Sequence, residues 1–203
     1  MKTKMSPLAK LYVALIIVFL YAPIVVMIVF SFNSSVSTSV MSGFSTRWYT
    51  SLFRDEGTMK ALVNTLILAV SSSLIATVMG TAAAVGINAM KNKWLKRGVM
   101  SVTNIPMMNP EIVTGISMML LFVFAAKLLG VTDALGFWTM LIAHVTFNLP
   151  YVILSVLPKL RQLDPRLPEA AMDLGCTPVQ AFFKVTLPSI MTGITSGLMM
   201  SFT

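Results

Sequence analysis

The sequence predicts an all-α membrane protein with several transmembrane helices. Hydrophobic residues make up 56% of its 203 residues and charged residues only 11%, and the mean hydropathy is +0.83. This composition is typical of membrane proteins and excludes an ordinary soluble globule. Apolar stretches with at most one carboxylate recur along the chain, and roughly 20 such residues cross a bilayer as a helix. We expect membrane spans at residues 11–32, 61–90, 98–126, 134–158 and 187–203.

Most basic residues fall in every second segment between the predicted spans, and these segments all lie on the same side of the membrane. The chain carries 15 Lys and Arg against 7 Asp and Glu, a formal net charge of +8. Loops rich in Lys and Arg stay in the cytoplasm, which predicts a cytoplasmic N-terminus, a cytoplasmic segment at 159–186 and an external segment at 33–60. Topology therefore explains the positive charge, which is no sign of nucleic-acid binding. The basic residues on the cytoplasmic side are Lys2, Lys4, Lys10, Lys91, Lys93, Lys96, Arg97, Lys159, Arg161, Arg166 and Lys184.

Sequence motifs for catalysis or metal binding are missing. The single cysteine, Cys176, excludes a disulfide within the chain. The patterns GxxxxGK[ST], HExxH, GxSxG and CxxC do not occur, so the chain carries no ATPase motif and we expect neither a metal nor another cofactor. An enzyme of the membrane interior is the alternative. It would need a nucleophile–base pair or a set of metal ligands, and His144, the only histidine, has no acidic partner nearby in the sequence.

The first span and the external segment after it contain only structural signals. Residues 11–32 are uncharged and no small-residue cleavage site follows, so we interpret them as a retained anchor and not as a signal peptide. The external segment carries Phe44, Trp48, Tyr49 and Phe53, which suit the headgroup region of a bilayer. An interfacial helix with no role in substrate binding is the simplest interpretation.

The second span, residues 61–90, carries small side chains at a helical spacing. Ser72, Ala76, Gly80 and Ala84 follow one another every four residues. Small residues on one face allow another helix backbone to approach closely. We therefore predict that this face packs against a neighbouring helix.

The third span, residues 98–126, is expected to be broken. Pro106 and Pro110 each remove a backbone donor. Asn109 is suited to cap a restarted half-helix, with Pro110 at its first position and Glu111 beside the positive end of its dipole. Glu111 is the only charged residue deep within a span, and such a residue by default indicates a function. The alternatives are that it caps its half-helix or pairs with a neighbouring subunit.

The last two spans differ in character. In residues 134–158, His144 and Asn148 place polar groups within the membrane, and for His144 a hydrogen bond between helices is the simpler interpretation. Residues 187–203 would form about 26 Å of helix, which is short of the roughly 30 Å hydrocarbon core. We therefore expect the chain to be truncated in its fifth span.

The segment between the fourth and fifth spans predicts two short helices joined by a corner. A helix that begins near Pro168 places Glu169 in its first turn, where a carboxylate suits the dipole. Gly175 suits a left-handed cap at the end of that helix. Thr177 and Pro178 then form the N-cap and first residue of a second helix. On local chemistry alone, an ordinary cytoplasmic loop is an equally good interpretation.

The spacing of this segment resembles a known signature. It reads EAAxxxG at 169–175, then nine residues, then VxLP at 185–188, similar to the EAA loop of bacterial ABC-importer permeases. Beyond this loop, YAPIVVMIVFSFNSS at 21–35, MMNPEIVTGISMMLLF at 107–122 and AHVTFNLPYVILSV at 143–156 resemble permeases of spermidine/putrescine importers, most closely the second of the two in that system. The resemblance covers essentially all 203 residues. It implies the MetI-like fold of type I ABC importer permeases.

The resemblance assigns expected roles to two groups of residues. The loop would couple the chain to a cytoplasmic ATPase through Glu169, Ala170, Ala171, Asp173, Gly175, Leu187 and Pro188. A polyamine carries several ammonium groups, so its pathway needs carboxylates, amide oxygens and aromatic faces. The candidates for that pathway are Glu111, Asn109, Asn148, Phe147, Tyr151 and His144.

The resemblance also implies partners and a location. These are a second permease, an ATPase dimer that binds the ATP, an extracytoplasmic substrate-binding protein and a polyamine substrate, in a bacterial cell membrane with no nucleic acid involved. Two alternatives stay open. The chain could be a permease for another small solute such as an oxyanion, against which Glu111 argues, or a truncated assembly subunit that does not transport.

The predicted topology can be tested on Cys176. Because this residue falls in the cytoplasmic segment, a membrane-impermeant thiol reagent should label it only after cells are permeabilised. A cysteine introduced at Ser35 of the external segment, in a chain with Cys176→Ala, should be labelled in intact cells. Labelling of Cys176 from outside intact cells would overturn the topology.

Overall fold

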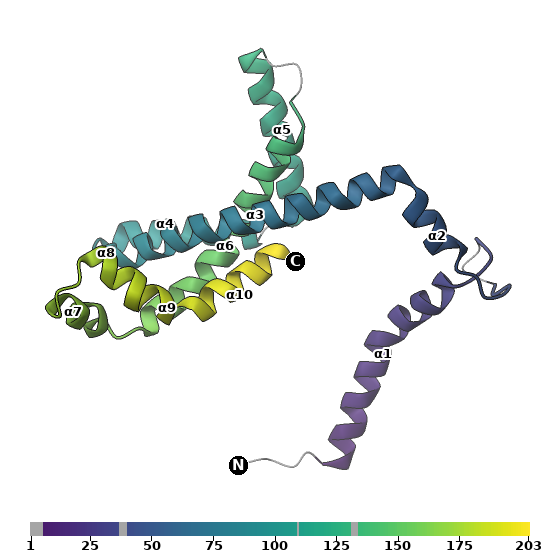
Figure 1. Cartoon of the computed structure of the whole chain (residues 1–203), viewed down its shortest axis with the longest axis horizontal. Coiled ribbons are helices and arrows are strands. Elements are labelled where there is room, and N and C mark those ends of the chain that lie inside the picture. The colour runs from purple at the N-terminus through teal and green to yellow at the C-terminus, as the bar shows by residue number, and fades with distance from the viewer. Residues whose placement is uncertain (1–5, 37–39, 109, 131–133) are drawn as a thin grey trace. The chain divides into compact units, whose positions relative to one another are not determined.

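In the computed structural model, described for residues 6–36, 40–108, 110–130 and 134–203, all regular elements are helices, as predicted (Figure 1). Two compact units arise, Met1–Val63 and Asn64–Thr203. Four helices are long and apolar enough to cross a membrane: α1 (Pro7–Ser31), α3 (Glu56–Ala89), α5 (Glu111–Leu129) and α6 (Phe137–Gln162). The chain is thus a multi-pass membrane protein.

The first unit contains α1, the short helix α2 (Arg47–Arg54) and the start of α3. Ser6 caps α1 by accepting a hydrogen bond from the Ala9 backbone N–H at 3.2 Å. Asp55 precedes α3, and Thr58 donates to its carboxylate from both hydroxyl and backbone N–H. These hydrogen bonds, the one from the hydroxyl first, lower the pKa of Asp55. Caps of this kind supply partners for the first N–H groups of a helix.

A buried amide organises the chain between α1 and α2. Asn33 is only 1% exposed. Its Nδ2 donates to the Val40 carbonyl at 2.7 Å, and its Oδ1 accepts from the Ser42 N–H at 2.9 Å. The Asn33 carbonyl accepts from the Trp48 indole at 2.8 Å. The sequence predicted only an interfacial position for Trp48. In the structure its indole N–H also fixes this loop through the hydrogen bond to Asn33.

The second unit contains the rest of the membrane helices and the segment that resembles the EAA loop. Its further elements are α4 (Lys93–Met108), α7 (Arg166–Asp173), α8 (Pro178–Ala181), the π-helix η1 (Phe182–Thr186), α9 (Leu187–Ser189) and α10 (Met191–Phe202). The break expected within 98–126 is present, but α4 continues through Pro106 to Met108 and α5 begins at Glu111. The expected broken span therefore consists of two helices. Of these two, only α5 is long and apolar enough to cross a membrane.

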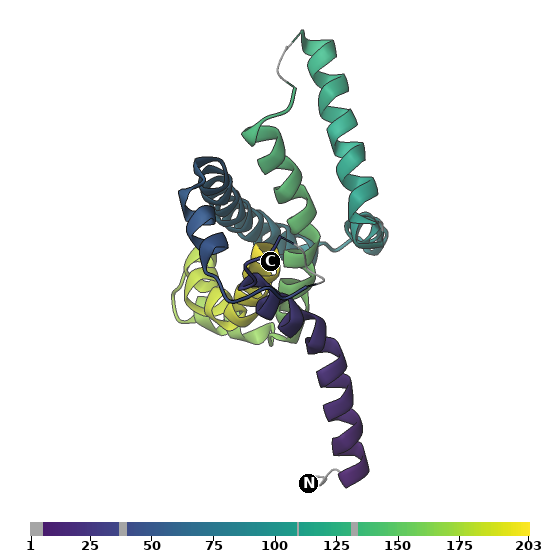
Figure 2. The same ribbon diagram turned by 90° about the vertical axis from the view of Figure 1, so that its right-hand side faces the viewer.

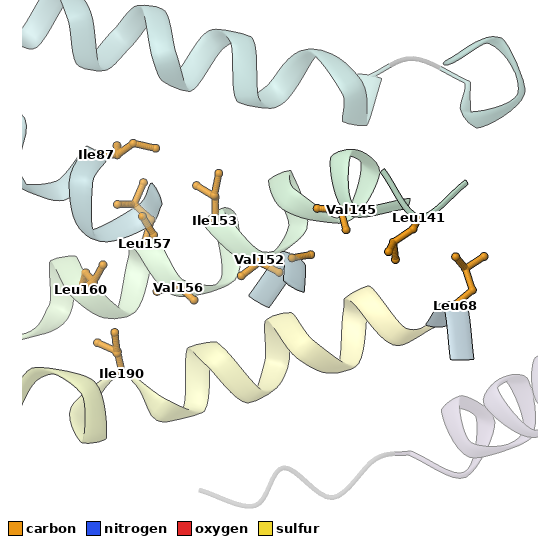
Figure 3. Packing of buried hydrophobic residues seen from close by; sticks show 12 residues of the cluster. Leu68, Ile87, Leu141, Val145, Val152, Ile153, Val156, Leu157, Leu160 and Ile190 are labelled. Atoms are coloured by element: carbon orange, nitrogen blue, oxygen red, sulfur yellow. The ribbon is translucent and has the colours of Figure 1, made fainter. Parts of the chain in front are cut away.

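Helix α6 is the centre of the second unit and packs against α3 and α10. Figure 3 shows its buried side chains in a row from Leu141 to Leu160. Val152 is fully buried, and a Cβ on Gly80 of α3 would lie 2.7 Å from the Val152 Cβ. A Cβ on Gly197 of α10 would lie 3.2 Å from the Val152 Cα. The two glycines therefore allow both neighbouring helices to approach α6 at close range.

The small-residue face of α3 is used as predicted. Ser72, Ala76, Gly80 and Ala84 are all buried. By contrast, α1 and α5 have no buried residue among the side chains that the structure describes. Figure 2 shows α5 beside the beginning of α6, with which it is in contact.

The chain turns sharply before α10. Pro188 lacks the N–H that would bond to the Lys184 carbonyl, and its ring would crowd that carbonyl in a regular α-helix. The preceding residues instead form the wider π-helical turn η1. The helical stretches Pro178–Ser189 and Met191–Phe202 meet at an angle of 67°. By itself α10 has only 12 residues and does not pass as a span; only the two bent stretches together do. The structure therefore does not show the expected span at 187–203 as a single helix.

The close approach at Gly80 predicts a large effect of a small substitution. Gly80→Ala should destabilise the chain by about 1–3 kcal/mol because its methyl group overlaps Val152. Gly86→Ala on the same helix is the matched control, since a Cβ there meets nothing within 4 Å. It should be neutral or stabilise by up to about 1 kcal/mol. The measurement is denaturant unfolding of the purified chain in detergent.

A second substitution identifies the cause. Val152→Ala alone should destabilise, but combined with Gly80→Ala it should cost less than the sum of the two single changes. Equal effects of Gly80→Ala and Gly86→Ala, or strict additivity with Val152→Ala, would contradict the proposed overlap.

Candidate functional site

The α7–α8 corner contains the first candidate site. Glu169 lies in the first turn of α7, as predicted, although the helix begins at Arg166 and not near Pro168. Gly175 has a φ of +91°, so the predicted left-handed cap is confirmed. Its N–H donates to the Met172 carbonyl at 2.9 Å, and the Cys176 N–H donates to the Ala171 carbonyl at 3.1 Å. This pair of bonds is a Schellman motif, which satisfies the last carbonyls of a helix and fixes the direction in which the chain leaves it.

The second half of the corner is fixed by a capping box. The Gln180 N–H donates to the Thr177 hydroxyl at 3.3 Å, and the Thr177 N–H donates to the Gln180 side chain at 3.0 Å. Pro178 follows as the first residue of α8, as predicted. Because the end of α7 and the start of α8 are both capped, the corner has a defined geometry.

The corner exposes apolar side chains. Leu174 is 88% exposed and Val179 is 65% exposed, while the Ala170 side chain and the Glu169 carboxylate are also at the surface. Exposed apolar groups rimmed by polar ones are typical of protein docking surfaces. Leu187 and Pro188 lie further on, in α9 and directly before the bend into α10. The chain from the corner to α10 is therefore almost continuously helical.

A cavity of about 870 Å³ contains the second candidate site. It is lined by five of the six residues predicted for a substrate pathway: Glu111, His144, Phe147, Asn148 and Tyr151. The sixth, Asn109, lies outside the described residues. The remaining lining residues are Thr65, Leu68, Ala69, Ser72, Pro106, Met199, Met200, Ser201, Phe202 and Thr203.

Glu111 reaches this cavity from the first turn of α5. The helix cap is Pro110, whose carbonyl accepts from the Val113 and Thr114 N–H groups at 3.0 and 3.2 Å. Pro110 is thus one position earlier than predicted, as cap and not as first helical residue. The positive end of the α5 dipole lies beside the carboxylate, as expected.

The other candidates share one face of α6. His144, Phe147, Asn148 and Tyr151 recur at intervals of three and four residues, which places them on the same side of a helix. His144 Nδ1 is 2.8 Å from the Met140 carbonyl, so its hydrogen bond is within α6 and not between helices as expected. Asn148 makes the bond between helices instead.

Asn148 connects α6 to α10. Its Nδ2 donates to the Ser201 carbonyl at 2.9 Å. The bond leaves the Asn148 side-chain oxygen as a further acceptor beside the cavity. Phe147 and Tyr151 are half-buried neighbours that present aromatic rings.

Sequence reasoning missed the contribution of α3 to the cavity. Thr65, Leu68, Ala69 and Ser72 line it and follow the helical period along α3. Thr65 and Ser72 were available signals, since hydroxyl groups within a span can mark a polar path. We assigned Ser72 to packing, and it is in fact both buried and a lining residue.

The cavity combines groups that suit a cation with an apolar chain. It offers the Glu111 carboxylate, an amide, an imidazole, aromatic rings and several hydroxyl groups among apolar side chains. Carboxylates, amide oxygens and ring faces all attract ammonium groups. Among the described residues no three His, Cys, Asp or Glu side chains gather in a way that could hold a metal ion.

Comparisons with known proteins identify relatives that match nearly the whole chain. It is 41% identical over 185 residues to the Putrescine transport system permease protein PotI of Escherichia coli (strain K12), which covers 91% of this chain and 66% of that protein. It is 37% identical over 192 residues to the Spermidine/putrescine transport system permease protein PotC of the same strain, covering 95% and 70%. For PotC of Haemophilus influenzae the identity is 33% over 196 residues, covering 97% and 74%.

The chain spans about two thirds of the length of the first of these relatives, at 66%. A family of membrane proteins, described as binding-protein-dependent transport system inner membrane component, matches residues 76–203. This match includes the α7–α8 corner and all of α6, whose sequences first indicated the resemblance. The chain belongs to the family of inner membrane components of binding-protein-dependent transport systems.

Proposed function

We propose that this chain is a permease subunit of an ATP-driven polyamine importer and forms the translocation path together with a second permease. The observation that carries the proposal is the cavity in which Glu111 shares the walls with Phe147, Asn148 and Tyr151. Relatives named as putrescine and spermidine/putrescine permeases support it. The proposed location is a bacterial cell membrane, with the N-terminus in the cytoplasm.

The chemistry of a polyamine matches this set of groups. Such a molecule carries ammonium groups separated by short methylene chains. An ammonium group without a partner is costly to bring into an apolar environment. The Glu111 carboxylate offsets that cost, the Asn148 oxygen accepts a hydrogen bond, and the aromatic rings attract the cation through their faces. An oxyanion would need donors or basic groups in place of Glu111, which favours a cationic substrate.

The α7–α8 corner supplies the proposed link to an energy source. Its exposed Leu174 and Val179 offer an apolar contact surface, and Glu169 adds a carboxylate at the rim. We assign docking of a cytoplasmic ATPase dimer, which would bind the ATP, to the seven residues predicted for coupling. An extracytoplasmic binding protein would deliver the polyamine, and the apolar faces of α1 and α5 are available to lipid and to the second permease.

The left-handed cap gives the first test of coupling. Gly175→Val should reduce substrate-stimulated ATP hydrolysis of the assembled importer by about 5- to 30-fold, because a left-handed conformation costs an ordinary residue about 1–2 kcal/mol. Gly175→Asn is the matched control, since Asn tolerates this conformation and a Cβ at Gly175 meets nothing within 4 Å. The measurement is ATP hydrolysis with and without substrate in reconstituted membranes.

Two outcomes would reject this role. Unchanged stimulation in Gly175→Val and in Glu169→Lys would show that the corner does not couple the ATPase. A loss of equal size in Gly175→Asn would show that the left-handed conformation is not the cause. Membrane insertion of every variant is checked by labelling of Cys176.

Glu111 gives the test of the substrate class. Glu111→Gln keeps the shape of the side chain and removes its charge, so polyamine uptake should fall about 10- to 100-fold, as expected for loss of a hydrogen bond to a charged group. Basal ATP hydrolysis and subunit assembly should be retained. The measurement is uptake of radiolabelled putrescine into vesicles.

The alternative for Glu111 is a structural cap. In that case Glu111→Gln would transport normally, while Glu111→Ala would fail to assemble. If the chain is instead an oxyanion permease, the wild-type protein shows no putrescine uptake. Glu111→Gln then has no uptake to reduce.

A further inference from the structure

A cluster of basic side chains converges on a cleft between α4 and α6. Lys93, Lys96 and Arg97 come from the start of α4, and Arg161 comes from the last turn of α6. Together with Met100 they line a cavity of about 340 Å³, here called the basic cleft. Among the described residues that line it, none is acidic.

The two helices hold these charges in place. Lys93, Lys96, Arg97 and Met100 are spaced as neighbours on one face of α4. Met100 is also partly buried against the hydrophobic core, so this end of α4 is packed and not a loose loop. Arg161 precedes α7 by a few residues, which places the basic cleft at the same end of α6 as the α7–α8 corner.

Membrane topology alone does not account for this convergence. The positive-inside rule requires basic residues in the cytoplasmic segments, but it does not require that they face one cleft. Like charges that share a cleft repel each other unless a carboxylate or a bound anion lies between them. Because the walls supply no carboxylate, the structure favours a bound anion.

Neighbouring contacts fit a position of the basic cleft at the level of lipid headgroups. The Trp94 side chain is 82% exposed, and the Arg97 guanidinium lies 6.0 Å from the centre of its ring. An exposed indole beside a cationic group is typical of the membrane–water interface. Lys96 Nζ donates to the Asn88 carbonyl at 3.2 Å, which holds this ammonium group at the end of α3.

The side chains, and not the helix terminus, would bind the anion. The Asn92 side-chain oxygen accepts from the Trp94 and Leu95 N–H groups at 2.9 and 3.3 Å. The N–H groups of Trp94 and Leu95 are therefore already used. The guanidinium groups of Arg97 and Arg161 remain, and guanidinium binds phosphate through paired hydrogen bonds.

We propose that the basic cleft binds the phosphate headgroup of an anionic phospholipid in the leaflet on the side of the α7–α8 corner. Basic pockets between membrane helices on the cytoplasmic side bind such headgroups. A free phosphate shares the headgroup chemistry, but the exposed Trp94, whose ring lies 6.0 Å from the Arg97 guanidinium, favours a ligand that is part of the membrane. The inference is independent of the transported substrate.

Lipid retention by the purified chain tests the proposal. The chain is titrated with phosphatidylglycerol in phosphatidylcholine mixed micelles, and bound lipid is counted by native mass spectrometry. Arg97→Gln combined with Arg161→Gln should weaken phosphatidylglycerol binding about 30-fold, the loss expected for two basic residues at a membrane surface. Lys10→Gln combined with Lys91→Gln removes the same charge outside the cleft and should have little effect.

The remaining variants separate the possible causes. Arg97→Lys combined with Arg161→Lys keeps the charge but loses the paired hydrogen bonds, so its binding should lie between that of the wild type and that of the Gln pair. Binding as weak as in the Gln pair would show that the positive charge itself contributes nothing. Equal weakening in both charge-removing pairs would overturn the basic cleft as a site. Displacement of phosphatidylglycerol by inorganic phosphate at millimolar concentration, or binding of phosphate alone with the same dependence on Arg97 and Arg161, would overturn the lipid assignment in favour of a soluble anion.

Discussion

The second unit depends on the close contact that α6 makes with α3 and α10 around Val152. Within a membrane, lipid chains are as apolar as leucine, so helices associate through close packing and not through exclusion of water. Gly80 and Gly197 meet Val152 from two sides, and a Cβ on Gly193 would lie 2.8 Å from the Ser155 carbonyl. At these positions a side chain has no room. Glycine at these few positions therefore allows the three helices to come close enough to pack tightly.

This contact also positions the cavity. Helix α6 uses one face, which includes Val152 and Val156, to pack in the core. An adjacent face carries His144, Asn148 and Tyr151 to the cavity wall. The bond from Asn148 to the Ser201 carbonyl lies between these faces. A single helix thus fixes both the packing and the polar groups, and movement of α10 against α6 would alter the cavity directly.

Local features of the structure could be predicted from the sequence, and features that depend on distant partners could not. The buried stripe of α3 and the left-handed Gly175 follow from spacing and from the properties of glycine. The bend before α10 could not be predicted, because a proline at the position of Pro188 is also compatible with the start of a straight helix. The loop around Asn33 depends on bonds to Val40, Ser42 and Trp48, which no local pattern indicates. In the cavity, the residues of α6 were predicted from the groups that a polyamine pathway needs, whereas the lining residues of α3 were not predicted.

The nearly unbroken helical path from Thr177 to α10 constrains how this part of the chain can change in length. Only Ile190, itself fully buried, separates α9 from α10. An α-helix turns by about 100° per residue, so inserting or deleting one residue before Ile190 would rotate α10 and turn Gly193 and Gly197 away from α6. The length of this segment is therefore set by the register of the glycines downstream as well as by the corner itself. Substitutions on its surface should be tolerated far more readily than any insertion or deletion.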